Sequence, residues 1–115
     1  MGSRSMGRKS DTVYMEKALT EIDLIRQFTD GLTYEQYISD IEVVYATMFA
    51  LQQLVEHIKS LSFDFKEHHS EIPWNEIVGF RNRIVHEYGK TDYTTVYDTI
   101  TNDIYQLKEL FENSI

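Results

Sequence analysis

A chain of 115 residues is long enough for one domain with a hydrophobic core and too short for two ordinary domains. A hydrophobic content of 42%, with 13% aromatic residues, excludes a disordered acidic tail. The formal net charge of −8 argues against a protein that binds nucleic acid through a general excess of Lys and Arg. Any activity on RNA must therefore come from a local basic patch.

The residue content excludes several other classes. The chain has no cysteine, which rules out disulfides, zinc fingers and thiol catalysis and is compatible with the cytoplasm. No apolar run approaches the ~20 residues of a membrane span. Residues 1–10 lack the apolar core of a signal peptide, and we expect them to be disordered or left over from cloning. Residues 11–115 are expected to form a single cytoplasmic helical domain.

Two helices are expected in the N-terminal half. Ser10 or Asp11 can accept hydrogen bonds from free amides, and an apolar stripe at spacings of three and four predicts a helix from there to Thr29. Residues 33–36 read Thr-Tyr-Glu-Gln, a capping box that predicts the start of a second helix. The apolar stripe that follows continues to Ser60, so we expect one long helix of about 40 Å at ~1.5 Å per residue.

The C-terminal half divides after a connection at residues 61–72, where we expect at most one short turn of helix. Pro73 suits a first helical turn and Gly89 a helix end, which predicts a third helix from Pro73 to about Tyr88. Asp92 can cap a last helix that runs nearly to the end of the chain. Amphipathic helices with short links predict an all-α, antiparallel bundle of four, or up to five, helices.

Most of the reactive side chains lie on the third expected helix. Arg81 supplies a permanent cation and His86 a proton-transfer group, the pair that phosphodiester cleavage needs. Asn82 shares a helix face with His86, four residues on, and can orient its imidazole. Tyr88 adds a phenol. Because Arg83 and Lys90 also lie here, this stretch is positive within a negative protein, and both are candidate phosphate contacts.

The spacing of Arg81 and His86 raises a geometric problem, because residues five apart diverge by about 140° on a regular helix. Either the helix unwinds before His86, or a second copy completes the site across a two-fold axis. In a dimer, one His can take the proton from an RNA 2'-hydroxyl while the other protonates the leaving oxygen. Arg81 would hold the phosphoryl group, and the scheme needs neither metal nor cofactor.

Structural roles for these residues remain open on chemistry and spacing alone. His86 can be a capped histidine near a helix end, and Arg81 a surface ion-pair partner. Arg83 can pair with Glu87 at i and i+4, and Tyr88 can be a half-buried packing residue.

Histidines elsewhere allow two readings each. His68 and His69 lie beside glutamates and suggest either a metal or, without helical spacing, a solvated linker. Glu56 and His57 can approach the site or form the polar flank of the long helix.

The order Arg81, four residues, His86, one residue, Tyr88 matches the R-x4-H-x-Y motif of HepT-like proteins in the HEPN superfamily. The resemblance extends upstream through residues 72–82 and covers about residues 13–112. It implies a dimeric helical bundle of the HEPN type and a metal-independent endoribonuclease without a cofactor. It further implies the toxin of a type VII-like toxin–antitoxin pair.

The resemblance also implies roles for individual residues. Arg81 and His86 match the catalytic pair, and Asn82 matches the supporting polar residue. Tyr88 matches the tyrosine that a cognate MntA-like minimal nucleotidyltransferase modifies with AMP, and a bulky anion there would repel RNA. The implied partners are a second copy of the chain, the nucleotidyltransferase antitoxin and an RNA substrate, with tRNA among the candidates.

One departure concerns the long helix, where members of the family commonly carry Ile-Gly-Glu and this chain has Leu-Val-Glu at 54–56. If the small residue permits close approach at the dimer seam, Val55 would push the helices apart. The acidic surface keeps a second function open, that of a non-enzymatic helical adaptor or substrate-binding partner of a nucleotidyltransferase.

Overall fold

The structure is a computed structural model that describes residues 2–80, 82 and 91–114. The elements in order are α1 (Gly2–Thr29), α2 (Tyr34–Ser39), α3 (Ile41–Lys59), α4 (Phe63–His68), α5 (Trp74–Val78), α7 (Tyr93–Asp98), the π-helical turn η2 (Thr99–Asp103) and α8 (Ile104–Ser114). These elements confirm the all-α class. Over the described part of the chain, no helix is long and apolar enough to cross a membrane.

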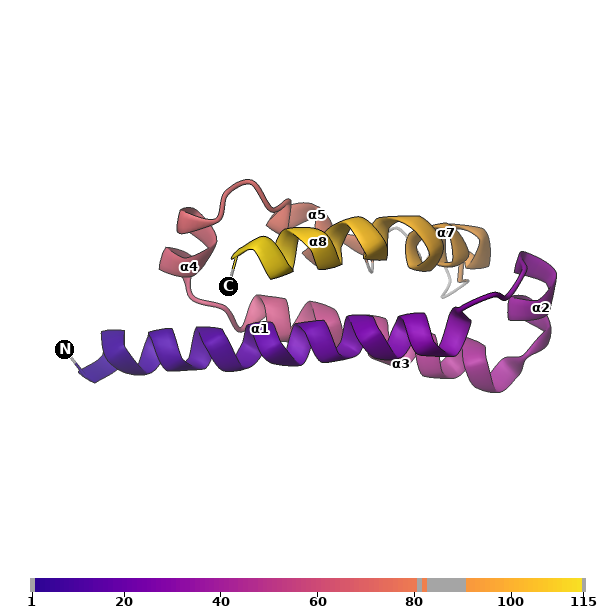
Figure 1. Cartoon of the computed structure of the whole chain (residues 1–115), viewed down its shortest axis with the longest axis horizontal. Helices are drawn as coiled ribbons and strands as arrows, with labels where there is room; N and C mark the ends of the chain where they lie inside the picture. The colour runs from indigo at the N-terminus through magenta and orange to yellow at the C-terminus, as the bar shows by residue number, and fades with distance from the viewer. Residues whose placement is uncertain (1, 81, 83–90, 115) are drawn as a thin grey trace.

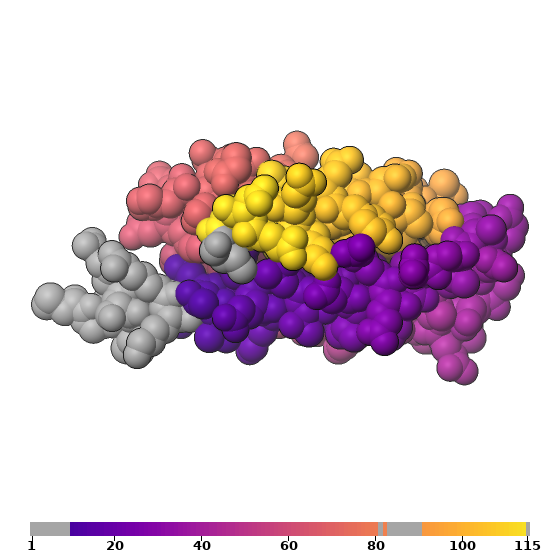
Figure 2. Space-filling model, in the orientation of Figure 1, coloured from indigo at the N-terminus to yellow at the C-terminus, as the bar shows by residue number. Residues whose placement is uncertain are grey.

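The helices form two layers. α1 and α3 pack side by side in opposite directions, and α7, η2 and α8 form one continuous rod above them (Figure 1). α5 packs on α3 beside this rod, while α2 and α4 lie at opposite ends of the bundle. Figure 2 shows α8 seated against α1. The antiparallel bundle expected from the sequence is therefore present.

The core lies between the two layers. Each long helix contributes one apolar stripe at spacings of three and four, because that spacing places side chains on one helix face. The buried core residues are Met15, Ala18, Ile22 and Ile25 of α1, Val44, Ala50, Leu51, Leu54 and Ile58 of α3, and Ile104, Leu107 and Phe111 of α8.

α1 begins earlier than the sequence predicted. It starts at Gly2 and includes residues 2–10, where disorder was expected, rather than starting near Ser10 or Asp11. Asp11 binds the N-cap residue of another helix instead. Its carboxylate accepts hydrogen bonds from the Ser62 amide at 2.7 Å and the Ser62 hydroxyl at 2.6 Å. Because Ser62 is the N-cap of α4 and accepts from the Phe65 amide, Asp11 ties α4 to α1.

We expect Asp11→Ala to destabilise the protein by about 1–3 kcal/mol, because it leaves a part-buried amide and hydroxyl without their acceptor. Glu16→Ala is the matched control, an exposed carboxylate on the same helix. The midpoint of urea unfolding, followed by circular dichroism, measures both variants. Equal midpoints for the two variants would contradict the tie between α4 and α1.

The capping box is confirmed, but the single long helix that should follow it is wrong. The Thr33 hydroxyl accepts from the Gln36 amide at 3.1 Å, and the Gln36 side chain accepts from the Thr33 amide at 2.9 Å. The helix then breaks at Asp40, whose backbone is extended and whose carboxylate accepts from the Val43 amide. Asp favours such caps because its short side chain competes for backbone amides. α2 and α3 are therefore separate helices.

A buried hydroxyl pair fastens α2 to α3. The fully buried Tyr37 hydroxyl lies 2.6 Å from the Thr47 hydroxyl, which itself donates to the Val44 carbonyl at 3.0 Å. A hydroxyl has one hydrogen, so Tyr37 donates to Thr47. Burial raises the pKa of the Tyr37 phenol above its ordinary value of 10.0, and the hydrogen bond between Tyr37 and Thr47 only partly opposes this shift.

This raised pKa predicts a loss of stability in alkali. Above pH 10 the unfolded chain ionises Tyr37 while the folded chain keeps it protonated, so the free energy of unfolding falls as the pH rises toward the folded pKa. Tyr37→Phe should cost about 0.5–1.5 kcal/mol at pH 7 and flatten this alkaline decline. Denaturant midpoints between pH 7 and 11 measure it, with the exposed Tyr45→Phe as control. An unchanged slope in Tyr37→Phe would refute it.

The last helix begins at Asp92 as predicted, since the Asp92 carboxylate accepts from the Thr95 amide at 3.1 Å. It contains the π-helical turn η2, which the sequence did not predict. On an α-helix, residues spaced by four drift by about 40° per step, whereas a π-turn holds more residues per turn. Val96, Ile100 and Ile104 are all buried, so η2 keeps this four-residue spacing aligned on the core.

Candidate functional site

The structure places one of the predicted site residues. Asn82 is exposed, and its amide donates to the Gly79 carbonyl at 3.0 Å. The other predicted residues fall outside the described part of the chain, so their roles stay predictions: Arg81, Arg83, His86, Tyr88 and Lys90. What the structure does define is the segment that leads into the motif.

The helix in that segment has a break that the sequence did not predict. Pro73 is the N-cap of α5, and α5 ends at Val78, so the helix expected to run unbroken from Pro73 is interrupted. Gly79 caps the end, with its amide 2.9 Å from the Asn75 carbonyl. A Cβ on Gly79 would meet that same oxygen at 3.2 Å, which is tight, so glycine suits this turn. Phe80 and Asn82 are again helical.

Trp74 anchors the start of α5. Its indole nitrogen donates to the Lys66 carbonyl at 3.1 Å and to the His69 carbonyl at 3.0 Å, and its ring stacks on Phe111 at 5.9 Å. The ring of Phe65 in α4 also contacts the indole, with the two ring centroids 6.1 Å apart. Trp74 thus joins α5 to α4 and α8. Contacts with α4 and with α8 therefore both fix the position of the segment that precedes the motif.

A cavity of about 240 Å³ opens between α3, α5, η2 and α8. Phe80, the residue before the motif, lines it. Most of the wall is apolar, and the polar lining comes from Thr99, Glu76, Asp103 and Gln106. The apolar lining residues are Leu51, Leu54, Val55, Pro73, Ile77, Phe80, Ile104, Leu107 and Leu110.

Val55 faces this cavity and is buried within its own chain, at 7% exposure. Its side chain is therefore accommodated inside its own bundle. The effect of Val55 on a dimer seam, expected if two copies approach closely there, stays a prediction.

Most cationic side chains that the structure describes already contact a carboxylate or an aromatic ring. Lys108 binds Asp23 at 2.8 Å, Lys59 pairs with Glu56 at 3.5 Å, and Arg26 lies over the ring of Tyr105. The cavity adds carboxylates rather than cations. For residues 10–80 and 91–114, these arrangements make an RNA contact electrostatically unfavourable.

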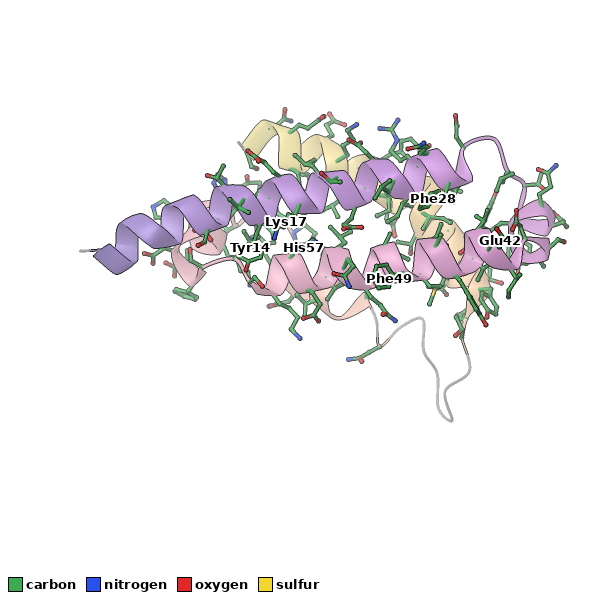
Figure 3. All side chains as sticks on the ribbon, turned by 90° about the horizontal axis from the view of Figure 1, so that it is seen from below. Tyr14, Lys17, Phe28, Glu42, Phe49 and His57 are labelled. Atoms are coloured by element: carbon green, nitrogen blue, oxygen red, sulfur yellow. The ribbon has the colours of Figure 1, made fainter. Side chains whose placement is uncertain are left out.

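His57 turns away from α5 and toward α1. Its imidazole lies 3.5 Å from the Glu21 carboxylate, and the ring of Tyr14 lies beside it with Lys17 over that ring. Figure 3 shows Tyr14 and Lys17 meeting His57 between the two helices. Among the described residues, the contacts of His57 are therefore with α1, as expected for the polar flank of α3.

The two adjacent histidines make local contacts. His68 bonds the Asp64 carbonyl at 2.7 Å, while His69 lies 3.7 Å from Glu71 and packs on the ring of Phe65. Among the described residues, no group of three or more His, Cys, Asp or Glu is placed to hold a metal ion.

Two features around the site were not foreseen from the sequence. One is the cavity, which depends on contacts between residues far apart in the chain. The other is the outer face of α3, where large apolar side chains are exposed although they continue the expected stripe. Residues 43–55 carry no charge at all, and that signal in the sequence could have located the face.

Comparison with known proteins defines the class. A family model described as ribonuclease HepT-like matches residues 18–114. A probable ribonuclease HepT of Thermococcus cleftensis is 33% identical over 105 residues, covering 91% of this chain and 96% of the relative. Two proteins named putative RNases are similar: one of Caldanaerobacter subterraneus, 31% identical over 88% of this chain and 90% of its own length, and one of Methanocaldococcus jannaschii, 30% identical over 96% and 95%. No solved structure matches significantly.

The helical bundle, the order of the motif and these matches thus define a protein of the ribonuclease class. The chain belongs to the HepT-like ribonuclease family. The resemblance seen in the R-x4-H-x-Y motif is confirmed over nearly the whole chain.

Proposed function

We propose that this protein is a metal-independent endoribonuclease, the toxin of a type VII-like HepT/MntA toxin–antitoxin pair, acting on RNA in the cytoplasm. Family membership is the observation that carries the proposal. The intact spacing of Arg81, His86 and Tyr88 supports it residue by residue. The anchored segment from Trp74 to Phe80 supports it too, because a catalytic helix needs a rigid base.

The proposed reaction uses the RNA itself as nucleophile. One His86 takes the proton of a 2'-hydroxyl, whose oxygen forms a bond to the adjacent phosphorus. The bond from phosphorus to the 5'-oxygen breaks, and a second His86 protonates that leaving oxygen. Arg81 stabilises the charge on the phosphoryl oxygens. The products are a 2',3'-cyclic phosphate and a free 5'-hydroxyl.

A homodimer supplies the second His86 in this proposal. On one regular helix Arg81 and His86 diverge, so a two-fold axis that brings two motifs together offers a cation and two imidazoles in one cleft. Asn82 orients the imidazole of its own chain. Arg83 and Lys90 contact flanking phosphates, and tRNA is a candidate substrate.

Control of the toxin is proposed to act at Tyr88. A MntA-like nucleotidyltransferase transfers AMP from ATP to the Tyr88 hydroxyl. The phenol oxygen bonds to the α-phosphorus, pyrophosphate leaves and the phenol proton is released, which places a phosphodiester anion close to Arg81. This anion competes with the RNA phosphate for Arg81 and repels RNA, so the modified protein does not cleave RNA.

The alternative is a non-enzymatic helical adaptor that binds a nucleotidyltransferase and serves as its substrate. The net charge of −8 and the occupied cations favour it, since both disfavour nucleic acid as a partner.

Growth of cells on induced expression separates the two functions. The toxin halts growth, and His86→Ala restores it while leaving the protein folded and able to bind the nucleotidyltransferase. The adaptor predicts identical growth for wild type and His86→Ala.

A further inference from the structure

The cavity between α3 and the layer of α5, η2 and α8 has the size and walls of a site for a small molecule (Figure 1). Its volume is about 240 Å³, whereas a cavity of about 150 Å³ already holds a six-carbon ring. On that scale it has room for roughly ten non-hydrogen atoms. Apolar side chains make most of the wall, so the body of an occupant has to be apolar.

The charged part of the lining is acidic. Glu76 on α5 and Asp103 on η2 are exposed to solvent, and neither carboxylate has an ion-pair partner among the described residues. The described lining residues include no lysine, arginine or histidine. Both carboxylates favour a cationic group at the mouth of the cavity, and the net charge of −8 adds to that preference.

A buried hydroxyl is an independent sign of a ligand. Thr99 lines the cavity and is only 8% exposed, but its hydroxyl forms no hydrogen bond with another described residue. The hydroxyls of Thr95 and Thr101, on the same helical rod, both donate, to the Asp92 carboxylate and to the Tyr97 carbonyl. Because buried hydroxyls are normally paired, the Thr99 hydroxyl is available to an occupant of the cavity.

The π-helical turn η2 explains how these groups reach one wall. Residues four apart stay closer to one line on a π-turn than on an α-helix. Thr99 and Asp103 are four apart and both line the cavity, while Ile100 between them is fully buried in the core. Such turns occur often at functional sites, because they redirect side chains within an otherwise regular helix.

We propose that this cavity binds a small amphipathic amine, with an apolar body of roughly six to nine carbon atoms inside and one primary ammonium group at the mouth. A primary ammonium has three donors and no acceptor. Glu76, Asp103 and Thr99 each offer it an acceptor. A free amino acid is excluded, because its carboxylate would lie against those of Glu76 and Asp103.

Phe80 connects the cavity to the motif. It is 5% exposed, lines the cavity and directly precedes Arg81 in the chain. A bound amine therefore contacts the residue that leads into the motif. Binding of the amine does not depend on the proposed function, whereas any effect of the amine on RNA cleavage does. The site is for this reason tested without RNA.

Isothermal titration calorimetry of the full chain with n-alkylamines, from butylamine to octylamine, tests the site. The affinity should rise about four-fold for each added CH₂ group, as expected for burial of a methylene. 1-Octanol should bind at least about five-fold more weakly than octylamine, because it lacks the charge. Octanoate should not bind, because two carboxylates at the mouth repel it.

Variants separate the charge of the site from its shape. Glu76→Gln combined with Asp103→Asn should weaken octylamine binding at least about five-fold and leave 1-octanol binding unchanged. The matched control Glu109→Gln, an exposed carboxylate on α8 outside the cavity, should change neither. Thr99→Val should weaken octylamine binding about 3- to 10-fold. Leu110→Trp places a larger side chain at a partly exposed lining position and should abolish binding of both probes.

Several results would overturn the amine site. The first is no saturable binding of octylamine, and the second is binding of 1-octanol as tight as that of octylamine. A double variant at Glu76 and Asp103 that binds octylamine as Glu109→Gln does would also contradict it. So would undiminished binding by a Leu110→Trp protein whose circular dichroism is native. A protein that binds octylamine as expected and cleaves no RNA keeps the amine site and counts against the nuclease, so the two proposals fail separately.

Discussion

Replacing His86 by alanine is expected to lower the rate of RNA cleavage at least ~100-fold, because general acid–base catalysis contributes 10²–10⁴-fold and both proton transfers depend on this residue. Arg81→Ala is expected to lower the rate by ~100-fold or more, since it removes the cation from the developing charge. Initial rates on an end-labelled RNA, with folding checked by circular dichroism, measure both effects.

The matched control for His86→Ala is His68→Ala, which removes an exposed imidazole on α4 with only a local bond to the Asp64 carbonyl. Lys66→Ala removes a cation from the same helix and is the matched control for Arg81→Ala. Both controls should cleave at the wild-type rate. Comparable losses in the controls and in the motif variants would show that general charge, and not the motif, governs cleavage.

Trp74→Ala is expected to be the most destabilising single substitution at the site, at about 3–5 kcal/mol. It empties a packed position between Phe65 and Phe111 and leaves two carbonyls without the indole donor. The free energy of unfolding, from urea titration, measures this loss. Cleavage should fall as well, because Trp74 holds the segment that leads into the motif.

Trp74→Phe separates the two contributions. It keeps an aromatic ring against Phe111 and removes only the hydrogen bonds, so a smaller loss of about 1–3 kcal/mol is expected. The Ile38→Ala variant, which truncates an exposed apolar side chain, should change monomer stability little. A loss below 1 kcal/mol in Trp74→Ala would refute the anchoring role of this residue.

The helix caps could be predicted where the signal was local. The capping box at Thr33 and Gln36 and the cap at Asp92 each involve residues three apart, so the pattern in the sequence carries the whole interaction. The same local logic missed the break at Asp40, because the apolar stripe on either side continues through it. Two competing local preferences, capping and helix periodicity, meet there, and capping wins.

Long-range contacts escaped prediction for a different reason. Ser10 or Asp11 was expected to cap the first helix. Asp11 instead accepts hydrogen bonds from Ser62, the N-cap of α4, 51 residues away, and no periodicity encodes that pairing. The turn η2 keeps Val96, Ile100 and Ile104 aligned on the core, whereas residues four apart on a regular α-helix would drift away from it. The exposure of Tyr45 and Phe49 reflects which face α1 and α5 leave uncovered, which depends on the tertiary arrangement.

One part of the candidate site could be predicted from local sequence, and another part depends on long-range contacts. The order of Arg81, His86 and Tyr88 identifies the family from sequence, while the segment before it gains its rigidity from Trp74 and its contacts. The spacing of five residues predicts that one helix cannot aim both groups at one phosphate, and this is why a second copy is central to the account.

The most direct test is incubation of the purified protein, confirmed by mass to carry no nucleotide on Tyr88, with bulk RNA and tRNA in a metal chelator. The account predicts cleavage that leaves 2',3'-cyclic phosphate ends and is lost in His86→Ala and Arg81→Ala. Absence of cleavage by the folded, unmodified wild type, or cleavage that persists in both variants, would contradict it.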